Sequence, residues 1–387
     1  MSDFAIICEF NPLHGGHQYL IDEARRLGAD RVVCVMSGGA VQRGSLAVTD
    51  PYLRAECAIR AGADLVVELP FPWSSASAEQ FARAGVCIAS RLADTLIFGS
   101  ECGDLALLEK GATLASEENF RTAYGESLAS GAPAAGAYYG MLEDALGKKL
   151  SSNDILGVEY LRAIQAEGGA MRAMTVKREG AAYGADTLRE GEFPSATGIR
   201  RLWESGHFEE ADAFLPEECR EVFRRARNEG RLVKEEKLES LILGWFRLHT
   251  GEDFSEIAGA GGGLFHRFCA VASEVTSLSE FYEGIRTKRY TDAHLRRAVL
   301  YGLTGVKEGE FSSLPQYTTL LAANERGRAL LSEYRRGGDL PVITKPSDAP
   351  ADTVQYQRGE KLGRLLALAT DRTETGGFLL KKTPFIL

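Results

Sequence analysis

The sequence lacks several features that would place it in a specialised class of protein. No apolar run approaches the length of a membrane span, and the first residues do not pair a basic segment with an apolar stretch. The seven cysteines are odd in number and form no Cys-x-x-Cys pair. This cysteine pattern fits a reducing compartment, so we expect a cytoplasmic protein that does not contact membranes.

Excess basic charge is also missing, because 45 Lys and Arg stand against 54 Asp and Glu and give a net charge of −9. No global basic field can attract nucleic acid, so DNA is not an expected partner and any RNA contact must come from a local patch. Neither an internal repeat nor a low-complexity segment is visible, and no Ser–His or Cys–His pair predicts a covalent enzyme intermediate. The 387 residues, 44% of them hydrophobic, suffice for two domains.

The most informative segment that is present is Phe10-Asn11-Pro12-Leu13-His14-Gly15-Gly16-His17. It follows an apolar strand predicted over Phe4–Glu9 and precedes an amphipathic helix predicted over Gln18–Leu27. The first N–H groups of a helix and its dipole favour an anion. The two histidines are three positions apart and share a face, and Gly16 permits a close approach. We predict a nucleotide phosphate site here. The alternative is that the two histidines only cap the helix. A zinc site is disfavoured, because no third His or Cys lies nearby at the spacing of zinc ligands.

Short apolar runs alternate with helical patterns over the first hundred residues, which indicates a parallel sheet covered on both faces. Right-handed crossovers make this an α/β fold with a Rossmann-like doubly wound sheet, whose ligands bind at the carboxyl ends of the strands. Those ends are His14–His17, Ser37–Gly39 and Gly99–Glu101. After Phe4–Glu9, the predicted strands are Arg31–Met36, Asp64–Leu69 and Thr95–Phe98, with helices at Pro51–Gly62 and Ser77–Arg91.

The rest of the chain is mostly helical in pattern. We predict an Ala-rich helical stretch to Leu150 with a break at Ser130–Gly136, a helix capped by Ser152-Asn153-Asp154, a strand at Arg172–Arg178, a loop at Gly180–Pro194 and a helix from Ser195. No strand signal is clear beyond Glu210 until a short one at Val342–Lys345. Further helices fit Glu217–Arg231, Glu235–Leu248, Leu264–Val275, Ala293–Leu303 and Thr318–Tyr334. We therefore predict a catalytic domain of residues 1–208 and a mainly α-helical domain of residues 209–387.

Two further segments support the phosphate turn. The run Ser195-Ala196-Thr197-Gly198-Ile199-Arg200 offers two hydroxyls at a helix start and a cation one turn later, which suits outer phosphates. Arg178 ends a predicted strand, where its planar fork can reach a phosphate or carboxylate. Each segment also has a simpler interpretation. Ser195–Arg200 taken alone is typical of an ordinary helix cap with a surface arginine, and Arg178 taken alone is typical of a solvated charge.

A basic stretch in the helical half is the candidate RNA contact. Such a cluster can hold a phosphate backbone, and an aromatic ring within it can stack on a base. A solvated helix face is the alternative, because acidic residues partly offset the charge. The stretch consists of Arg286, Lys288, Arg289, Arg296 and Arg297, with Tyr290 between them.

The chemistry implied by the phosphate turn is nucleophilic attack on the α-phosphate of ATP, with pyrophosphate leaving. The protein must hold the triphosphate in line and neutralise charge on the leaving group. Mg²⁺ is expected with ATP, whereas no protein metal site is predicted.

The paired His-x-Gly-His and Ser-x-Thr-x-x-Arg signatures resemble those of the nucleotidyltransferase superfamily, which implies a doubly wound sheet of the nucleotidyltransferase/HUP type. More narrowly, the chain resembles the bacterial tRNA(Met) cytidine acetate ligases, densely up to Arg200 and more sparsely after it. Leu13 and Gly15 replace a more usual aromatic residue and Asn, but both histidines are retained. The matching segments are Phe10–Pro12, Ser37–Gly39, Val41–Gly44, Gly62–Pro70, Ser77–Ala82, Phe98–Glu101, Ser152–Gly157 and Thr287–Thr291.

The resemblance implies an enzyme that activates acetate as acetyl-adenylate and transfers the acetyl group to the wobble cytidine of elongator tRNA(Met), forming N4-acetylcytidine. It implies that His14 and His17 are catalytic and that Lys288, Arg289, Arg296 and Arg297 face the tRNA. The ATP contacts expected on this basis are Ile7, Cys8, Glu9, Phe10, Asn11, Pro12, His14, Gly15, Gly16, His17, Leu20, Gly99, Asn153 and Arg178, to which the residues themselves add Ser195 and Thr197.

Two other functions stay open at this point. A small-molecule adenylyltransferase would share the phosphate chemistry, although such enzymes are usually much shorter. A non-catalytic RNA-binding protein could use a nucleotide as a structural ligand. The residues alone fix neither the carboxylate, nor the tRNA and its base, nor the oligomeric state.

Overall fold

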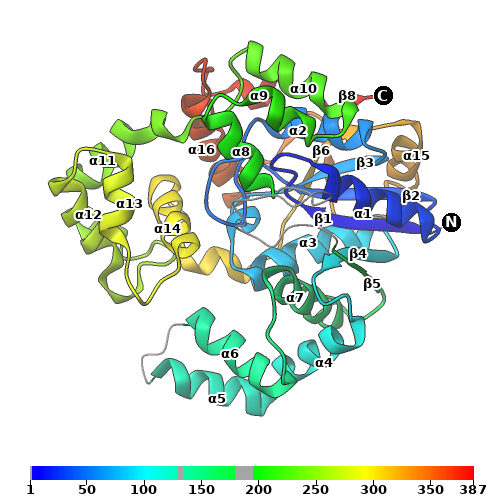
Figure 1. Ribbon diagram of the computed structural model, residues 1–387, viewed down its shortest axis with the longest axis horizontal. Helices are drawn as coiled ribbons and strands as arrows, with labels where there is room; N and C mark the ends of the chain where they lie inside the picture. The colour runs from blue at the N-terminus through cyan, green and yellow to red at the C-terminus, as the bar shows by residue number, and fades with distance from the viewer. Residues whose placement is uncertain (1, 130–133, 179–194) are drawn as a thin grey trace.

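The computed structural model describes residues 2–129, 134–178 and 195–387. Its centre is a sheet in the order β5-β4-β1-β2-β3-β6-β7, with β8 paired to β6 (Figure 1). The first five strands run parallel, which confirms the predicted doubly wound α/β architecture. They are β1 (Asp3–Cys8), β2 (Arg31–Ser37), β3 (Leu65–Leu69), β4 (Thr95–Ser100) and β5 (Arg172–Lys177).

Alternate residues of these strands point into two separate apolar cores. Ile6 and Cys34 lie in one core, while Ala5 and Val33 lie in the other. Because both faces are covered by helices, β1 to β4 are largely apolar and buried, as in other parallel sheets, whereas the edge strand β5 is only partly buried. The first core is completed by α1 (Gly15–Arg26), α2 (Pro51–Arg60) and α10 (Glu217–Asn228), the second by α3 (Ala78–Leu92) and α7 (Ser152–Ala166).

Strands β1 and β4 separate towards their carboxyl ends. All six residues of β1 have partners in β2, but β1 pairs with β4 only through Phe4 and Ala5 near its amino end. The crossovers also reverse direction here, because β2 and β3 lie on one side of β1 while β4 and β5 lie on the other. Ligands of doubly wound sheets bind at such a switch point. The sheet therefore places the predicted site between the ends of β1 and β4.

Two helical parts flank the sheet. In the view of Figure 1, one lies below α7 and the other lies to the left of the sheet. The first consists of α4 (Leu105–Ser116), α5 (Glu118–Ala129) and α6 (Ala134–Leu146). The second consists of α11 (Glu239–Leu248), α12 (Leu264–Glu274), α13 (Leu278–Ile285) and α14 (Asp292–Thr304) around a cluster of phenylalanine rings. The predicted loop at Gly180–Pro194 and residues 130–133 of the predicted break lie outside the described residues.

One predicted helix is wrong in its first part. We expected a single helix over Thr318–Tyr334, but Thr318–Ala323 form β6, which pairs antiparallel with β3, and α15 spans Glu325–Tyr334. Every residue of β6 is buried. A strand buried on both faces shows no alternation, so its sequence cannot be told from that of a buried helix. The expectation of no clear strand between Glu210 and Val342 is corrected with it.

Residues from the predicted second domain thus also build the sheet, and the division at residue 208 stays a prediction. The short strand predicted near Val342 is confirmed as β7. The remaining elements are β7 (Val342–Ile343), β8 (Phe385–Ile386), α8 (Ala196–Glu204), α9 (Phe208–Ala213), α16 (Val354–Ala369) and short 3-10 turns at Trp73–Ser75, Glu235–Leu238, Gly251–Phe254, Gly261–Gly263, Glu308–Ser312, Pro346–Asp348 and Phe378–Lys381. Across the described ranges, no helix combines the length and apolar character needed to cross a membrane.

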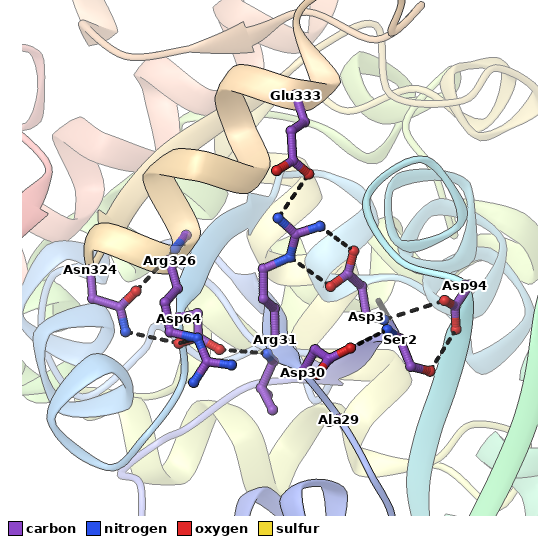
Figure 2. Close-up of polar contacts among 12 residues, drawn as sticks. Ser2, Asp3, Ala29, Asp30, Arg31, Asp64, Asp94, Asn324, Arg326 and Glu333 are labelled. Carbon is purple, nitrogen blue, oxygen red and sulfur yellow. Dashed lines mark hydrogen bonds and ion pairs between the residues drawn. The ribbon is translucent and has the colours of Figure 1, made fainter.

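Polar contacts tie the strands together at their amino ends, opposite the predicted site (Figure 2). Arg31 of β2 donates hydrogen bonds of 2.7 Å to both carboxylate oxygens of Asp3 in β1 and one of 2.8 Å to Glu333 in α15. Asp64 accepts from the backbone N–H of Val32 and from the Asn324 amide. These contacts fasten α15 to the parallel strands and so hold β6 at the edge of β3.

Candidate active site

The phosphate turn begins where β1 ends. Phe10 adopts a φ of 44°, which is uncommon for a residue other than glycine. Its ring is 1% exposed and meets the His17 ring edge-on at a centroid distance of 5.1 Å. Backbone strain of this kind persists where the surroundings hold it and is frequent at functional sites. Packing of Phe10 thus fixes the path of the chain into the histidine motif.

The two histidines cap α1 by hydrogen bonds through their Nδ1 atoms. Nδ1 of His14 accepts from the N–H of Gly16 at 3.1 Å, and Nδ1 of His17 accepts from the N–H of His14 at 3.3 Å. The rings lie 3.9 Å apart between centroids. A neutral imidazole whose Nδ1 accepts a hydrogen bond carries its proton on Nε2. Each ring is therefore held as an Nε2–H donor.

Electrostatics keep both rings neutral. Burial, and then the charge of Arg178, lower the pKa of His14 to about 4. Burial, followed by the charges of His14 and Arg178, lowers the pKa of His17 well below its usual value. Near neutral pH the pair thus offers two uncharged donors whose tautomer is set by the backbone.

The backbone N–H groups at the start of α1 differ from our expectation. We expected them to be open to an anion, but the N–H of Gly15 donates to the carbonyl of Phe214 at 3.3 Å and that of Gly16 to His14. The Gly15 partner is tertiary, because Phe214 is the C-cap residue of α9, whereas the Gly16 partner belongs to the histidine motif itself. The candidate donors for an anion at this turn are therefore the Nε2–H groups of the two histidine rings, and the helix dipole adds to their field.

A second group of residues gathers at the ends of β4 and β5, opposite the histidines. Arg178 directly follows β5, and its side chain crosses Gly99 so closely that a Cβ there would lie 3.0 Å from the Arg178 Cγ. Glu101 joins this group: its carboxylate accepts from the Asn153 amide at 2.6 Å and lies 3.4 Å from the Arg178 Nε. Gly99, Asn153 and Arg178, three of the predicted ATP contacts, are thus neighbours.

Asn153 is positioned by the start of α7. Ser151 is the N-cap, one residue earlier than the predicted cap; its hydroxyl donates to Glu101 and its backbone N–H donates to Asp154. Asp154 also accepts from Ser100 and from the N–H of Cys102, and these hydrogen bonds overcome its burial and lower its pKa to about 2. Glu101 and Asp154 therefore organise this side of the site, a role that the sequence did not reveal.

The Ser195–Arg200 segment docks onto the phosphate turn. Ser195 caps α8 by accepting from the N–H of Gly198 at 3.2 Å, and the Thr197 hydroxyl accepts from Arg200 at 3.1 Å. Arg200 also donates to the carbonyl of Asn11 at 2.6 Å. Both hydroxyls predicted for phosphate binding thus have protein partners, and the segment braces the turn.

Arg54 is a structural cation that sequence reasoning missed. It is completely buried and donates to the carbonyls of Glu9 at 2.6 Å, Ser37 at 2.8 Å, Thr49 at 3.3 Å and also Gly38. Burial lowers its pKa to about 10. Arg54 therefore holds the carboxyl ends of β1 and β2 together beneath the site.

Glu9 and Asn11 connect the turn to the loop after β2. The Glu9 carboxylate accepts a hydrogen bond from the N–H of Gln42 at 2.7 Å. The side-chain oxygen Oδ1 of Asn11 accepts one from the N–H of Val48 at 2.7 Å. Burial raises the pKa of Glu9. The other predicted ATP contacts lie along this path: Ile7 and Cys8 end β1, Pro12 is buried in the turn, and Leu20 is half-buried in α1.

The predicted RNA residues divide into two pairs. Lys288 and Arg289 are exposed between α13 and α14, and Arg289 stacks over the Tyr290 ring. Arg296 instead pairs with Glu235 at 3.0 Å. Arg297 is half-buried and donates to the carbonyl of Gln42 at 3.2 Å, and burial lowers its pKa. Both members of the second pair are therefore engaged within the protein, and Arg297 joins α14 to the loop after β2.

The arrangement suits a nucleotide. Neutral imidazole donors and the dipole of α1 lie on one side of the switch point, while Arg178 and Asn153 lie on the other. No group of three or more His, Cys, Asp or Glu side chains suited to a metal is found within the described ranges. Histidine donors at the first strand end of a doubly wound sheet, braced by Ser-x-Thr-x-x-Arg, define the nucleotidyltransferase class of proteins.

Comparisons with known proteins specify the family. The family described as HIGH Nucleotidyl Transferase matches residues 1–375. The tRNA(Met) cytidine acetate ligase of Thermotoga maritima is 36% identical over 359 residues, covering 88% of this chain and 86% of that protein. The protein of the same name from Caldanaerobacter subterraneus is 35% identical and covers 89% of both.

Solved structures agree with this result. The crystal structure of Thermotoga maritima TmcAL bound with alpha-thio ATP superposes with a TM-score of 0.90 at 31% identity, covering both chains completely. The apo form of that protein gives a TM-score of 0.91. The chain therefore belongs to the tRNA(Met) cytidine acetate ligase family of HIGH nucleotidyl transferases.

Proposed function

We propose that this protein activates acetate with ATP and transfers the acetyl group to the exocyclic amine of the wobble cytidine in elongator tRNA(Met), forming N4-acetylcytidine. The observation that carries the proposal is the histidine pair, whose rings are fixed as neutral Nε2–H donors beside Arg178. Support also comes from relatives named for this activity, which share about a third of their residues with this chain over most of its length.

In the first step, a carboxylate oxygen of acetate attacks the α-phosphorus of ATP, and the bond from that phosphorus to the pyrophosphate oxygen breaks. Negative charge builds on the phosphate oxygens as pyrophosphate leaves. His14 and His17 donate hydrogen bonds to these oxygens, and Arg178 supplies positive charge from the opposite side. Since the donors are neutral and preoriented, they need no proton transfer during the step. We propose that Mg²⁺ accompanies the triphosphate and neutralises part of its charge.

In the second step, the N4 amine of cytidine attacks the carbonyl carbon of acetyl-adenylate. AMP leaves as the amide bond forms, and the nitrogen releases one proton. Lys288 and Arg289 are exposed and suited to the tRNA backbone. A tRNA substrate also agrees with the cytoplasmic location expected from the sequence.

Exchange of labelled pyrophosphate into ATP tests the first step. We expect exchange that requires acetate and that other small carboxylates support less well. Exchange seen only after tRNA is added would place activation after tRNA binding. If ATP binds but no exchange occurs with or without tRNA, the proposal is contradicted. A product that retains AMP would instead favour an adenylyltransferase.

Transfer of labelled acetate to tRNA tests the second step. The label should appear in elongator tRNA(Met) as N4-acetylcytidine at the wobble position. A matched transcript with uridine at that position is the control, because it lacks the exocyclic amine. Label in both transcripts would contradict the proposed acceptor.

A further inference from the structure

A hollow of about 530 Å³ lies next to the candidate active site, on the side of β5. Glu101, which holds Asn153 and lies beside Arg178, forms part of its wall, so the hollow and the site share a boundary. Its other lining residues are Cys102, Lys148, Lys149, Leu150, Ser151, Asp154 and Lys177. Three lysines thus surround a space that opens beside the nucleotide contacts.

The carboxylates of this hollow are occupied by internal partners. Glu101 accepts from Ser151 and Asn153 and faces Arg178. Asp154 accepts from the Ser100 hydroxyl and from the N–H groups of Ser151 and Cys102. No ion pair is found for the three lysines among the residues that the structure describes. The three lysines outnumber the two carboxylates of the lining, and Asp154 is buried, so the exposed charge around the open space is mainly positive.

Hydrogen bonds and packing hold the backbone that carries these lysines. The turn that carries Lys148 and Lys149 is fastened at both sides to Glu143, whose carbonyl accepts from the N–H of Lys148 at 3.1 Å and whose carboxylate accepts from that of Leu150 at 2.9 Å. Leu150 is buried and anchors the turn. Lys177 is paired in register with Ser100, and its Cβ and Cγ pack against Gly103. All three lysines are exposed.

We propose that Lys148, Lys149 and Lys177 bind backbone phosphates of the tRNA strand that carries the target base, while the base itself enters the site past Glu101. This inference rests on the proposed function and adds to it an RNA surface on the catalytic part of the chain. Lysine is a flexible point charge that suits sequence-independent phosphate contacts. Lysines on two separate segments around an open hollow fit an extended strand better than a single small anion.

The three lysines also add cations for RNA that the helical part of the chain lacks. Two of the four cations expected to hold RNA there, Arg296 and Arg297, are engaged by Glu235 and by the carbonyl of Gln42. Because the protein has a net charge of −9, its overall field does not attract RNA, and binding depends on local clusters of cations. Three lysines beside the nucleotide contacts supply phosphate contacts close to where the acetyl group is transferred.

The test uses a triple variant, Lys148→Gln, Lys149→Gln and Lys177→Gln, and a matched control, Lys345→Gln, Lys381→Gln and Arg336→Gln. The control cations are exposed, and Lys345 follows β7 at the opposite edge of the sheet from β5. The affinity for elongator tRNA(Met) is measured at several salt concentrations between about 50 and 200 mM. Thermal unfolding verifies that each variant is folded.

We expect the triple variant to bind tRNA at least about 10-fold more weakly at low salt and to lower the slope of log K against log[salt] by about 2 to 3, since each lost phosphate contact removes about 0.7 to 0.9. The control should keep the affinity and slope of the parent. Equal losses in both variants, or a triple variant like the parent, would overturn the proposal.

Two outcomes separate this inference from the proposed function. A parent protein that binds no tRNA would overturn both. A triple variant that binds tRNA normally but ATP more weakly would assign the lysines to the free nucleotide, and so would overturn the RNA surface while leaving the proposed function intact.

Discussion

The guanidinium of Arg200 donates a hydrogen bond of 2.6 Å to the backbone carbonyl of Asn11, which lies 189 positions earlier in the chain. This single contact joins the second signature of the sequence to the first. It shows that Arg200 supports the chain just before the histidine pair. The site thus depends on a brace between α8 and the end of β1.

Removal of this brace should impair catalysis. For Arg200→Ala we expect acetyl-adenylate formation to fall by about 100-fold, because small displacements of positioned donors have effects of that size. Arg201→Ala is the matched control, since Arg201 is exposed on the same helix. Pyrophosphate exchange measures both rates, and equal rates in the two variants would rule out the brace.

Loss of a histidine donor should affect the transition state directly. His14→Ala or His17→Ala should lower the rate of acetyl-adenylate formation by about 10²–10³-fold, the usual effect of one lost electrostatic donor. His207→Ala provides the control, because that exposed side chain makes no capping hydrogen bond. The assigned role would fail if either variant kept the parent rate.

The lowered pKa of His14 predicts a pH dependence of stability. The folded state keeps His14 neutral down to about pH 4, whereas the unfolded state takes up a proton near 6.5. Between these values the unfolded state binds more protons, so the free energy of unfolding falls as the pH falls from 6.5 towards 4. His14→Asn retains a side-chain acceptor for the Gly16 N–H but cannot titrate.

Urea unfolding at several pH values compares the two proteins. We expect the His14→Asn variant to lose less stability than the parent between pH 6.5 and 4, because one titrating group has been removed. Parallel curves for the two proteins over this range would show that the folded state does not hold His14 neutral.

Arg54 should matter mainly for folding. Arg54→Met should lower the free energy of unfolding by about 3–5 kcal/mol, because buried carbonyls at the ends of β1 and β2 lose their donor. Arg60→Met on the same helix is the control: Arg60 forms a half-exposed ion pair with Glu56, worth at most about 1 kcal/mol. Urea unfolding at pH 7 distinguishes them, and losses of similar size would refute the assignment.

The two basic pairs of the helical part should behave differently. Lys288→Ala with Arg289→Ala should weaken tRNA binding and flatten its salt dependence while acetyl-adenylate formation continues. Arg297→Ala should instead lower the melting temperature, since Arg297 joins α14 to Gln42. Filter binding and thermal unfolding check these outcomes. Unchanged tRNA affinity in the first variant would move the RNA contact away from α13 and α14.

Local signals explain how much of the fold the sequence could predict. Apolar runs between helical patterns predicted the first four parallel strands, and the mixed segment Arg172–Arg178 was predicted as the fifth, because each signal lies within about ten residues. The segment Thr318–Ala323 was predicted as a helix because a strand buried on both faces has no polar alternation to reveal it. Its pairing with β3 depends on a contact between residues more than 250 positions apart in the chain, Val66 and Ala322 among them.

The candidate site likewise has features that the local sequence sets and features that depend on tertiary contacts. By itself, the sequence determined that a histidine-bearing turn opens a helix after the first strand, because strand, turn and capping residues are neighbours in the chain. The same local motif also sets the ring nitrogens, because Nδ1 of His14 and Nδ1 of His17 accept from N–H groups two and three positions away. Only the tertiary structure decided that both rings are buried, that Arg178, Glu101 and Asn153 meet, and that Arg297 is engaged inside the protein. Those outcomes depend on burial and on partners far away in sequence, and no local pattern encodes either.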